Sequence, residues 1–199
     1  MTEFEENVQR MVKDVEHLLS RKLPVAAGKI AKQHFQENFL KGGFVNGGLH
    51  PWQPSKRLSS GGPGADSHYP TLLSSRKHLF SSIGYTPGHA KVTVFNDVIY
   101  APIHNEGGTI TVPVTARMRR FAWAKYYSLG GGRNGAQEGR EGSKNANPDE
   151  AGKWKGLALT KKQALTINMP RRQFMGDSAE LTEKIAEYLE KELLKIVNQ

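Results

Sequence analysis

One short run of the sequence carries residue types that could act as an acid–base pair. His104 is followed by Asn105 and Glu106, and an imidazole held by a carboxylate can serve as a general base in hydrolysis. The same run is typical of a histidine that hydrogen-bonds to the backbone at a turn. Because no nucleophile motif accompanies it, the sequence favours the turn. We therefore expect no catalytic residue, and a hydrolase that uses His104 and Glu106 is the weakest hypothesis.

Sites for metals, cofactors and phosphates are not indicated by the sequence either. None of the seven histidines has the spacing of a helical zinc site. The absence of cysteine excludes disulfides, thiolate metal ligands and cysteine nucleophiles. The run from Gly130 to Gly135 resembles a phosphate-binding loop but lacks the Gly-Lys-Ser/Thr ending. We expect it to be a flexible linker, and we expect neither a metal nor a cofactor.

A basic and aromatic segment, residues 115–127, is the stronger candidate for binding. Mixtures of this kind hold phosphates and stack on bases, but arginine and aromatic residues also concentrate in protein interfaces. A nucleic-acid-binding module over residues 117–127 is therefore the alternative to a protein interface. We favour the protein interface, and its expected residues are Arg117, Arg119, Arg120, Phe121, Trp123 and Lys125.

The excess positive charge of the chain is confined to one region. The sequence holds 28 Lys and Arg against 19 Asp and Glu, a net charge of +9. Residues 115–172 hold 13 basic and 4 acidic side chains, whereas residues 173–199 hold 3 basic and 6 acidic ones. A basic region suits an acidic partner, either nucleic acid or protein. A solvated, lysine-rich loop is the simpler explanation of the same charges.

Length and composition indicate a folded protein of one domain. A chain of 199 residues is long enough to bury a substantial core. No apolar run approaches the roughly 20 residues of a membrane helix, and the acidic start of the chain does not fit a signal peptide. We expect a soluble protein made in a cytoplasm, with no contact with a membrane.

The spacing of apolar residues predicts four helices, and the last of them is the clearest. A break at Ser20–Lys22 separates the first two, and Gly42 and Gly43 end the second. Asp177 is the expected cap of the last helix, which we expect to pack on a sheet. The predicted ranges are Glu3–Leu19, Pro24–Leu40, Thr71–Ile83 and Ser178–Val197.

Alternating apolar residues predict short strands between these helices. Residues 44–70 are typical of an extended loop anchored by Trp52, and residues 115–163 form a long insertion. We expect its Gly-rich middle, residues 129–156, to be structureless and mobile. The fold class is therefore α+β, with N-terminal helices and a C-terminal helix on a small antiparallel sheet, in a single domain of residues 1–199. The predicted strands are Lys91–Phe95 and Val98–Ala101, paired as a hairpin, then Thr109–Val114 and Ala164–Met169.

The order of five short motifs resembles the virion morphogenesis, or tail completion, family of tailed bacteriophages. Gln173 differs from the proline that this family often has before the phenylalanine of its last motif. The motifs are Trp52-Gln53-Pro54, Leu79-Phe80-Ser81-Ser82-Ile83, Tyr100-Ala101-Pro102-Ile103-His104-Asn105-Glu106-Gly107-Gly108, Met118-Arg119-Arg120-Phe121 and Met169-Pro170-Arg171-Arg172-Gln173-Phe174-Met175-Gly176.

The resemblance implies that the motif residues have structural roles. The glycines permit unusual backbone angles, Pro170 ends a strand, Arg171 and Arg172 face an edge, and Phe174 enters the core. The implied motif positions are Trp52, Tyr100, Ile103, His104, Gly107, Gly108, Pro170, Arg172, Phe174 and Gly176.

The resemblance also implies a function without catalysis. The protein would complete the tail of a phage or prophage, or join the tail to the head, as a ring of identical subunits. Its partners would be copies of itself and other tail or head–tail connector proteins, with at most weak, non-specific contact with nucleic acid. It would be made in the cytoplasm of a bacterial host and then enter the virion. The basic region of residues 115–172 and the acidic final helix are an attractive pair for contact between subunits.

Overall fold

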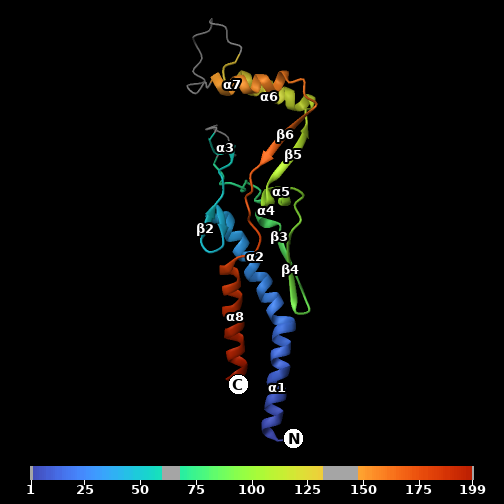
Figure 1. The fold of residues 1–199 in the computed structure, drawn as a ribbon, viewed down its shortest axis with the longest axis vertical. Coiled ribbons are helices and arrows are strands. Elements are labelled where there is room, and N and C mark those ends of the chain that lie inside the picture. Colours follow the sequence, from blue (N-terminus) through green and yellow to red (C-terminus); the bar gives the residue numbers. More distant parts are fainter. Residues whose placement is uncertain (1, 60–67, 132–147, 199) are drawn as a thin grey trace. The chain divides into compact units, whose positions relative to one another are not determined.

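A computed structural model describes residues 2–59, 68–131 and 148–198. The chain forms two compact units. We call Met1–Gly108 with Met169–Gln199 the core unit, and Thr109–Asn168 the hairpin unit (Figure 1). Helices combine with two-stranded antiparallel sheets, which confirms the α+β class.

The N-terminal helices of the core unit form one continuous helical rod. Helix α1 (Glu3–His17) runs through the π-helix η1 (Leu18–Lys22) into α2 (Leu23–Lys41). The predicted break at residues 20–22 is therefore wrong, because a wider π turn carries the helix through these residues. Gly42, with φ of +69°, ends α2 in the left-handed conformation that favours glycine.

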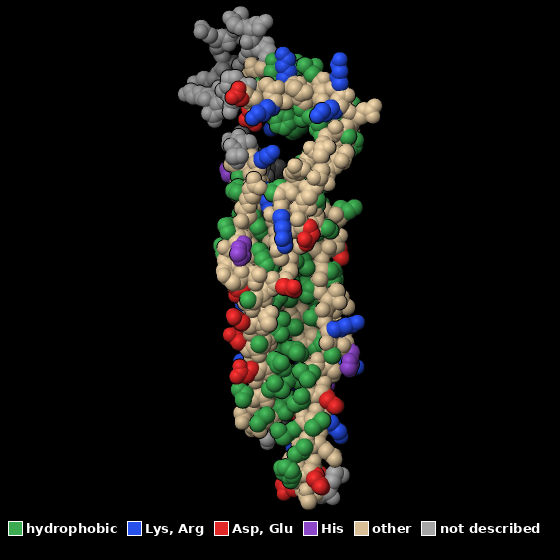
Figure 2. Space-filling view, viewed as in Figure 1, with side chains coloured by type: hydrophobic (Ala, Val, Ile, Leu, Met, Phe, Trp, Pro, Cys, Tyr) green, Lys and Arg blue, Asp and Glu red, His purple; other side chains and the backbone are tan. Residues whose placement is uncertain are grey.

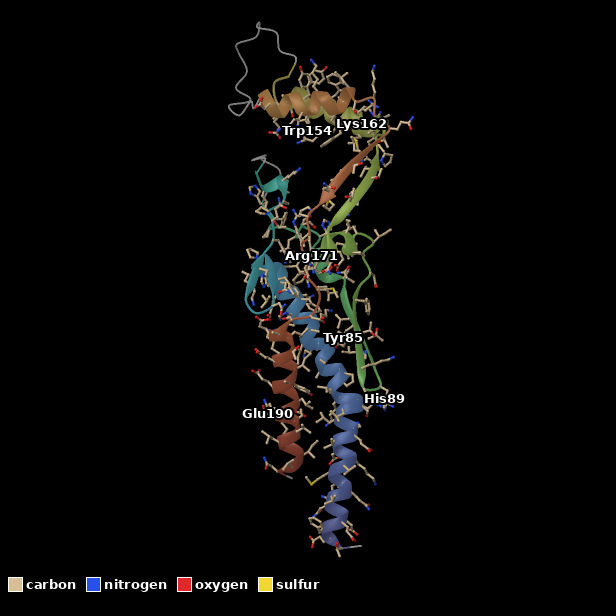
Figure 3. The ribbon with its side chains drawn as sticks, viewed as in Figure 1. Tyr85, His89, Trp154, Lys162, Arg171 and Glu190 are labelled. Atoms are coloured by element: carbon tan, nitrogen blue, oxygen red, sulfur yellow. The ribbon has the colours of Figure 1, made fainter. Side chains whose placement is uncertain are left out.

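A hairpin packs against α2, and it differs from the predicted one. Strand β3 (Ile83–Gly88) pairs with β4 (Lys91–Asn96). The ring of Tyr85 on β3 lies over Gly28 of α2, where any larger residue would overlap it (Figure 3). The predicted helix Thr71–Ile83 is reduced to α4 (His78–Ser81), because Ile83 already begins the strand.

The second half of the predicted hairpin, residues 98–101, is not a strand. Val98 enters the core at 6% exposure while Ile99 is 94% exposed, and the chain turns into α5 (Ala101–Glu106). The predicted loop of residues 44–70 contains the short pair β1 (Gly43–Val45) and β2 (Leu49–Pro51), as well as α3 (Lys56–Ser59).

The hydrophobic core of this unit gathers residues from segments far apart in the sequence. Phe39 of α2 lies at its centre with no exposed surface. Trp52 is 7% exposed, so it anchors the loop in the core as predicted. The other buried members are Ala31, Phe35, Phe44, Leu73, Leu79, Ile83, Val98, Ala101 and Phe174.

Helix α8 (Ala179–Val197) closes the core unit. It packs on α2 and α1 rather than on a sheet, which corrects the expected position. Its cap is Ser178, whose hydroxyl accepts a hydrogen bond from Leu181 N, and not Asp177. Glu180 instead reaches the β1–β2 turn and accepts hydrogen bonds from Gly47 N and Gly48 N. Hydrogen bonds from backbone N–H groups lower the pKa of Glu180 to about 2, and the largest effects come from the N–H groups of Glu180 itself and of Gly48.

The hairpin unit is built from two strands and two helices. Strand β5 (Gly108–Pro113) pairs with β6 (Ala164–Met169), close to the predicted ranges. Between them α6 (Ala116–Ser128) packs against α7 (Pro148–Leu159). The expectation of a structureless stretch over residues 129–156 is therefore wrong from residue 148 onward, because packing on α6 stabilises a helix there despite its glycines. Residues 132–147 lie outside the described residues.

Candidate functional site

The last predicted motif, Met169–Gly176, runs from the end of β6 into a segment without regular secondary structure, and residues 172–175 are its centre. Side chains from three other segments bind its backbone. Trp52 Nε1 donates to the Gln173 carbonyl at 2.7 Å, and Asn38 Nδ2 donates to the Phe174 carbonyl at 3.1 Å. Asn105 Oδ1 accepts from Phe174 N at 2.9 Å and from Met175 N at 3.0 Å. These bonds satisfy backbone groups that a strand would otherwise pair.

Arg172 is buried, whereas the sequence placed it at an edge. Its side chain is 7% exposed, and Nε donates to the Gln53 carbonyl at 2.8 Å. Its backbone N–H donates to the His104 carbonyl, also at 2.8 Å. Arg172 therefore joins three of the predicted motifs, those containing Trp52, His104 and Phe174. Arg171, the neighbouring residue, is exposed (Figure 3).

Phe174 completes the aromatic centre of the core unit. It is 1% exposed, and its ring centroid lies 5.1 Å from that of Phe39. The Phe39 ring also meets Trp52 edge-on, at 5.5 Å. Tilted and edge-on pairs of this kind add to the stability gained from area burial alone.

Helix α5 carries the residues that could have formed an acid–base pair. The Tyr100 ring, at the start of α5, lies edge-on to His104 with centroids 5.9 Å apart. Its hydroxyl is 3.1 Å from His78 Nδ1. Glu106 is exposed and accepts a hydrogen bond from Asn105 Nδ2. His104 and Glu106 line different cavities, so the structure does not bring the proposed acid and base together.

The predicted glycine positions after α5 differ in how tightly they are enclosed. Gly107 has φ of +72°, and a Cβ there would lie 2.7 Å from Arg171 N. Gly108 has φ of +128° and faces the half-buried Ile103, whose Cδ1 would be 3.3 Å from an added Cβ. Pro170 directly follows β6, and Gly176, with φ of +152°, ends the 172–175 segment.

Two asparagines that position the 172–175 segment were missed among the predicted site residues. Asn38 has no exposed surface, and its Oδ1 also accepts from Val45 N at 3.3 Å. It lies between Phe35 and Phe39 on the apolar face of α2, and a polar residue there was an available signal. Asn105 was noticed only as a neighbour of His104, and nothing in its spacing showed that its amide would bind a distant segment.

The predicted interaction residues gather on α6 in the hairpin unit. Arg117, Arg120 and Lys125 are exposed. Arg119 is half-buried and donates from Nη1 to the Ala158 and Thr160 carbonyls, so it stabilises the C-terminal end of α7. Part of the Arg119 guanidinium is therefore used in stabilising this unit rather than in binding a partner.

The aromatic residues of the hairpin unit are exposed or half-buried. Phe121 is 52% exposed and meets Trp154 of α7 edge-on, with centroids 5.7 Å apart (Figure 3). Trp123 stacks on Tyr127, at 5.7 Å and 22° between planes, and also contacts Tyr126. The buried residues of the two helices are alanines: Ala122, Ala151 and Ala158. Large rings outside a core of small residues are available for a partner.

The pKa values of two histidines of the core unit, the buried His34 and the half-buried His104, are lowered by their surroundings. His34 is 2% exposed, and neither of its ring nitrogens has a hydrogen-bond partner among the described residues. Burial lowers the pKa of His34 below its usual 6.5, and the positive charge of Lys184 lowers it further. Burial, and then Arg172, lower the pKa of His104. The other charged groups that act on His34 are Glu37, Glu180 and Lys41.

We expect the protein to lose stability as the pH falls below 6.5. The histidine pKa is lower in the folded than in the unfolded chain, so unfolding takes up protons below pH 6.5. Each group then costs at most about 1.4 kcal/mol per pH unit. Urea unfolding at pH 7.5 and 5.5 measures this slope. His34→Leu should reduce it while the exposed control His17→Leu leaves it unchanged, and an equal slope in all three chains contradicts the assignment.

Within residues 2–59, 68–131 and 148–198, no helix is long and apolar enough to cross a bilayer. The same part of the chain holds no cluster of three or more His, Asp or Glu that could bind a metal.

Comparison with known proteins places the chain in a family. Neither the comparison with curated proteins nor that with solved structures found a match. A model of the phage virion morphogenesis family, in contrast, matches residues 5–194. This match includes every motif of the core unit and the whole hairpin unit, and it indicates a structural or assembly role in a phage virion. The chain therefore belongs to the phage virion morphogenesis family.

Proposed function

We propose that this chain is a non-enzymatic assembly protein that completes a phage tail or joins the tail to the head, as a ring of identical subunits. The observation that carries the proposal is the apolar surface that the core unit leaves uncovered. The family match supports the same role.

Helices α1 and α8 expose apolar stripes. Neither helix has a buried residue. On α1, Phe4, Val8 and Val12 are 75%, 42% and 52% exposed, and on α8 Leu194 and Val197 are 54% and 62% exposed. Figure 2 shows hydrophobic side chains gathered in a band over the core unit. Helices in proteins gain most of their stability by packing an apolar face, so these stripes fit a chain whose helices are completed by a neighbour.

An open groove provides a second, different apolar surface on the same unit. It has a volume of about 640 Å³ and lies between α2, β4 and α8. A ring requires head-to-tail contacts between two unlike surfaces of each subunit. The exposed stripe of α1 and this groove are two such surfaces. The apolar residues that line the groove are Ala27, Ala31, Phe35, Val92, Val94, Met175, Leu181 and Ile185.

The hairpin unit and helices α1 and α8 of the core unit carry opposite net charges. The described residues of the hairpin unit carry 8 basic and 2 acidic side chains. Helix α1 carries 5 acidic and 2 basic side chains, and α8 carries 5 acidic and 3 basic ones. Opposite charges on two surfaces steer association and fix its register. We infer that the basic face of α6 in one copy meets the acidic face of α8 in the next.

Charge reversal tests this contact. The triple change Arg117→Glu, Arg120→Glu, Lys125→Glu on α6 should weaken self-association about tenfold or more. The change Glu183→Lys, Glu187→Lys, Glu190→Lys on α8 should do the same, and mixing the two variants should restore association in part. Light scattering behind size exclusion, over a range of protein and salt concentrations, measures the mass, and electron micrographs show whether rings form.

Lys29→Glu serves as the control, because Lys29 is exposed on α2 and belongs to neither surface. A chain that remains monomeric under every condition contradicts the ring. A ring that resists salt and both reversals leaves self-assembly standing but removes the charged contact.

The second candidate function is nucleic-acid binding by the hairpin unit. It is favoured by the cluster of the half-buried Trp123 and Tyr126 with the exposed Tyr127. Lys155 Nζ lies over the Tyr126 ring, 5.9 Å from its centroid. Stacking rings beside cations bind single strands with a steep salt dependence. A gel-shift titration at low salt tests it. Binding lost in Trp123→Ala supports a specific site, whereas binding that depends on charge alone reflects only the net +9.

The partners and location follow from the proposed role. We infer that copies of this chain and the tail or head–tail connector proteins are its partners. It is made in the cytoplasm of the bacterial host before it enters the virion.

A further inference from the structure

A small pocket in the core unit is lined in part by Arg172. Its volume is about 260 Å³. Both polar and apolar groups line it, from the segment before α4, from α5 and from the 172–175 segment. The residues on which the argument rests are Thr71, Ser74, Leu79, Tyr100, His104 and Arg172.

Arg172 brings a buried positive charge to this pocket without an acidic partner. The ion pairs among the described residues are Lys184–Glu37 and Lys195–Glu192, so no described carboxylate neutralises Arg172. Its Nε and Nη2 donate to the Gln53 and Pro54 carbonyls at 2.8 and 3.4 Å, which hold the side chain in place but carry no negative charge. Buried charges in proteins are normally paired. A guanidinium has five N–H donors and stays charged even when burial lowers its pKa, as it does here.

His104, which lines the same pocket, has an unsatisfied ring nitrogen. Its Nδ1 is buried and has no hydrogen-bond partner among the described residues. Burial and the charge of Arg172 lower the pKa of His104, which favours the neutral imidazole. In the tautomer with a proton on Nδ1, a neutral imidazole donates one hydrogen bond without adding charge. The pocket thus offers donors around a single positive charge.

The other residues that line the pocket suit a ligand with a short polar group attached to an apolar chain. Thr71 and Ser74, which carry hydroxyls, line the wall of the pocket together with the buried Leu79. Leu72, also on the wall, has φ of +63°. This left-handed conformation is rare for leucine, and such strain is concentrated at binding sites.

We propose that this pocket binds a carboxylate, presented as an acidic side chain by a neighbouring protein of the assembly. One guanidinium and a neutral histidine balance a charge of −1, which a carboxylate carries. A phosphate, at about −1.5 to −2, would leave excess negative charge in a partly buried site. The N–H groups that Arg172 retains on Nη1 and Nη2, beside those bonded to Gln53 and Pro54, can donate to the two carboxylate oxygens. The identification of another virion protein as the source of the carboxylate rests on the proposed function. The carboxylate site itself does not.

Titration with small probes tests the site on the full-length chain. The probes are acetate, its neutral isostere acetamide, and inorganic phosphate, followed through the NMR signals of the His104 ring and of Arg172 Nε–H. We expect acetate to shift both signals with a dissociation constant on the order of 1–10 mM. Acetamide should shift neither, and phosphate should bind more weakly than acetate.

Two matched variants distinguish a loss of acetate binding in the pocket from a loss of folding. Ser74→Leu fills the pocket while Arg172 keeps its bonds, and it should weaken acetate binding at least about tenfold. Ser75→Leu changes the exposed neighbour, which does not line the pocket, and should leave binding unchanged. Arg172→Gln should abolish binding, but it also removes bonds to Gln53 and Pro54, so Ser74→Leu decides the result if that variant fails to fold.

Three results would overturn the carboxylate site: no saturable shift with acetate, an equal shift with acetamide, or tighter binding of phosphate. A peptide pair then tests the source, with N-acetyl-aspartyl-N-methylamide compared with its asparagine analogue. Tighter binding of the aspartyl compound than of acetate supports a protein side chain, and equal or weaker binding contradicts it. Because these titrations need no assembly, their failure is distinguishable from failure of the ring.

Discussion

Replacing Phe174 with alanine should lower the free energy of unfolding by about 3–5 kcal/mol, because it leaves a cavity at the centre of the aromatic core. Phe174 is 1% exposed and contacts Phe39. Urea unfolding followed by circular dichroism measures the loss. The change keeps the backbone groups that Asn38 and Asn105 bind, so the result reports packing alone.

Phe4→Ala is the matched control for this experiment, because Phe4 is 75% exposed on α1. In the monomeric chain it should change the free energy of unfolding by no more than about 0.5 kcal/mol. Equal losses in the two variants would show that the core unit is not organised around Phe174.

The second large effect is expected at Gly107, where the backbone leaves no room for a side chain. Gly107 has φ of +72° and ψ of −170°, a region that is open essentially to glycine alone. An added Cβ would lie 2.7 Å from Arg171 N and 3.0 Å from Arg171 Cα, and neither atom belongs to a flexible side chain. Strain and overpacking together should cost Gly107→Ala about 3 kcal/mol or more.

Gly42→Ala isolates the steric part of this effect. Gly42 also has a positive φ, +69°, but nothing lies within 4 Å of an added Cβ. Its cost should be about 1–2 kcal/mol, the price of the left-handed conformation for alanine. Urea unfolding compares the two variants, and the NMR signal of Arg172 N–H reports whether its bond to the His104 carbonyl is kept. A cost for Gly107→Ala no greater than that for Gly42→Ala contradicts the close approach.

The helices and the last two strands could be predicted because their patterns are long or clearly bounded. The periodic residues of α1, α2 and α8 leave few alternatives, and Gly42 marks the end of α2. The strand β6 was bounded by Pro170, which directly follows it. Here local propensity and tertiary packing favour the same structure.

The segment from residue 71 to 101 was misjudged because its apolar residues fit more than one period. Leu79, Phe80 and Ile83 have helical spacing, but Ile83 begins β3 instead. A short apolar run does not by itself distinguish helix from strand. The actual turn lies at His89 and Ala90, between the paired Gly88 and Lys91. Ala90 adopts a φ of +53° there, a conformation that its side chain does not signal.

Helix α7 was missed because its glycines suggested a loop. Gly152 and Gly156 lie within the helix, and nothing is within 4 Å of a Cβ added at either. Their low helix propensity costs about 1 kcal/mol each, and contact with α6 offsets this cost. The burial of Arg172 was missed for a related reason, since its acceptors are backbone carbonyls at residues 53 and 54. Every residue has a backbone carbonyl, so the residue types of a distant segment do not show that its carbonyls will accept these hydrogen bonds.

The bonds to the 172–175 segment also determine when the core can close during synthesis on the ribosome. Asn38 and Phe174 are 136 positions apart, and Trp52 and Gln173 are 121 apart. The N-terminal helices are made first, but Phe39 lacks its aromatic neighbour Phe174, and Trp52 lacks its acceptor on Gln173, until these residues have left the ribosome. Contacts this distant close slowly, and apolar surface exposed meanwhile invites aggregation. Helix α2, made early, is thus completed by a segment made much later, which delays the assembly-competent subunit until that segment has been made.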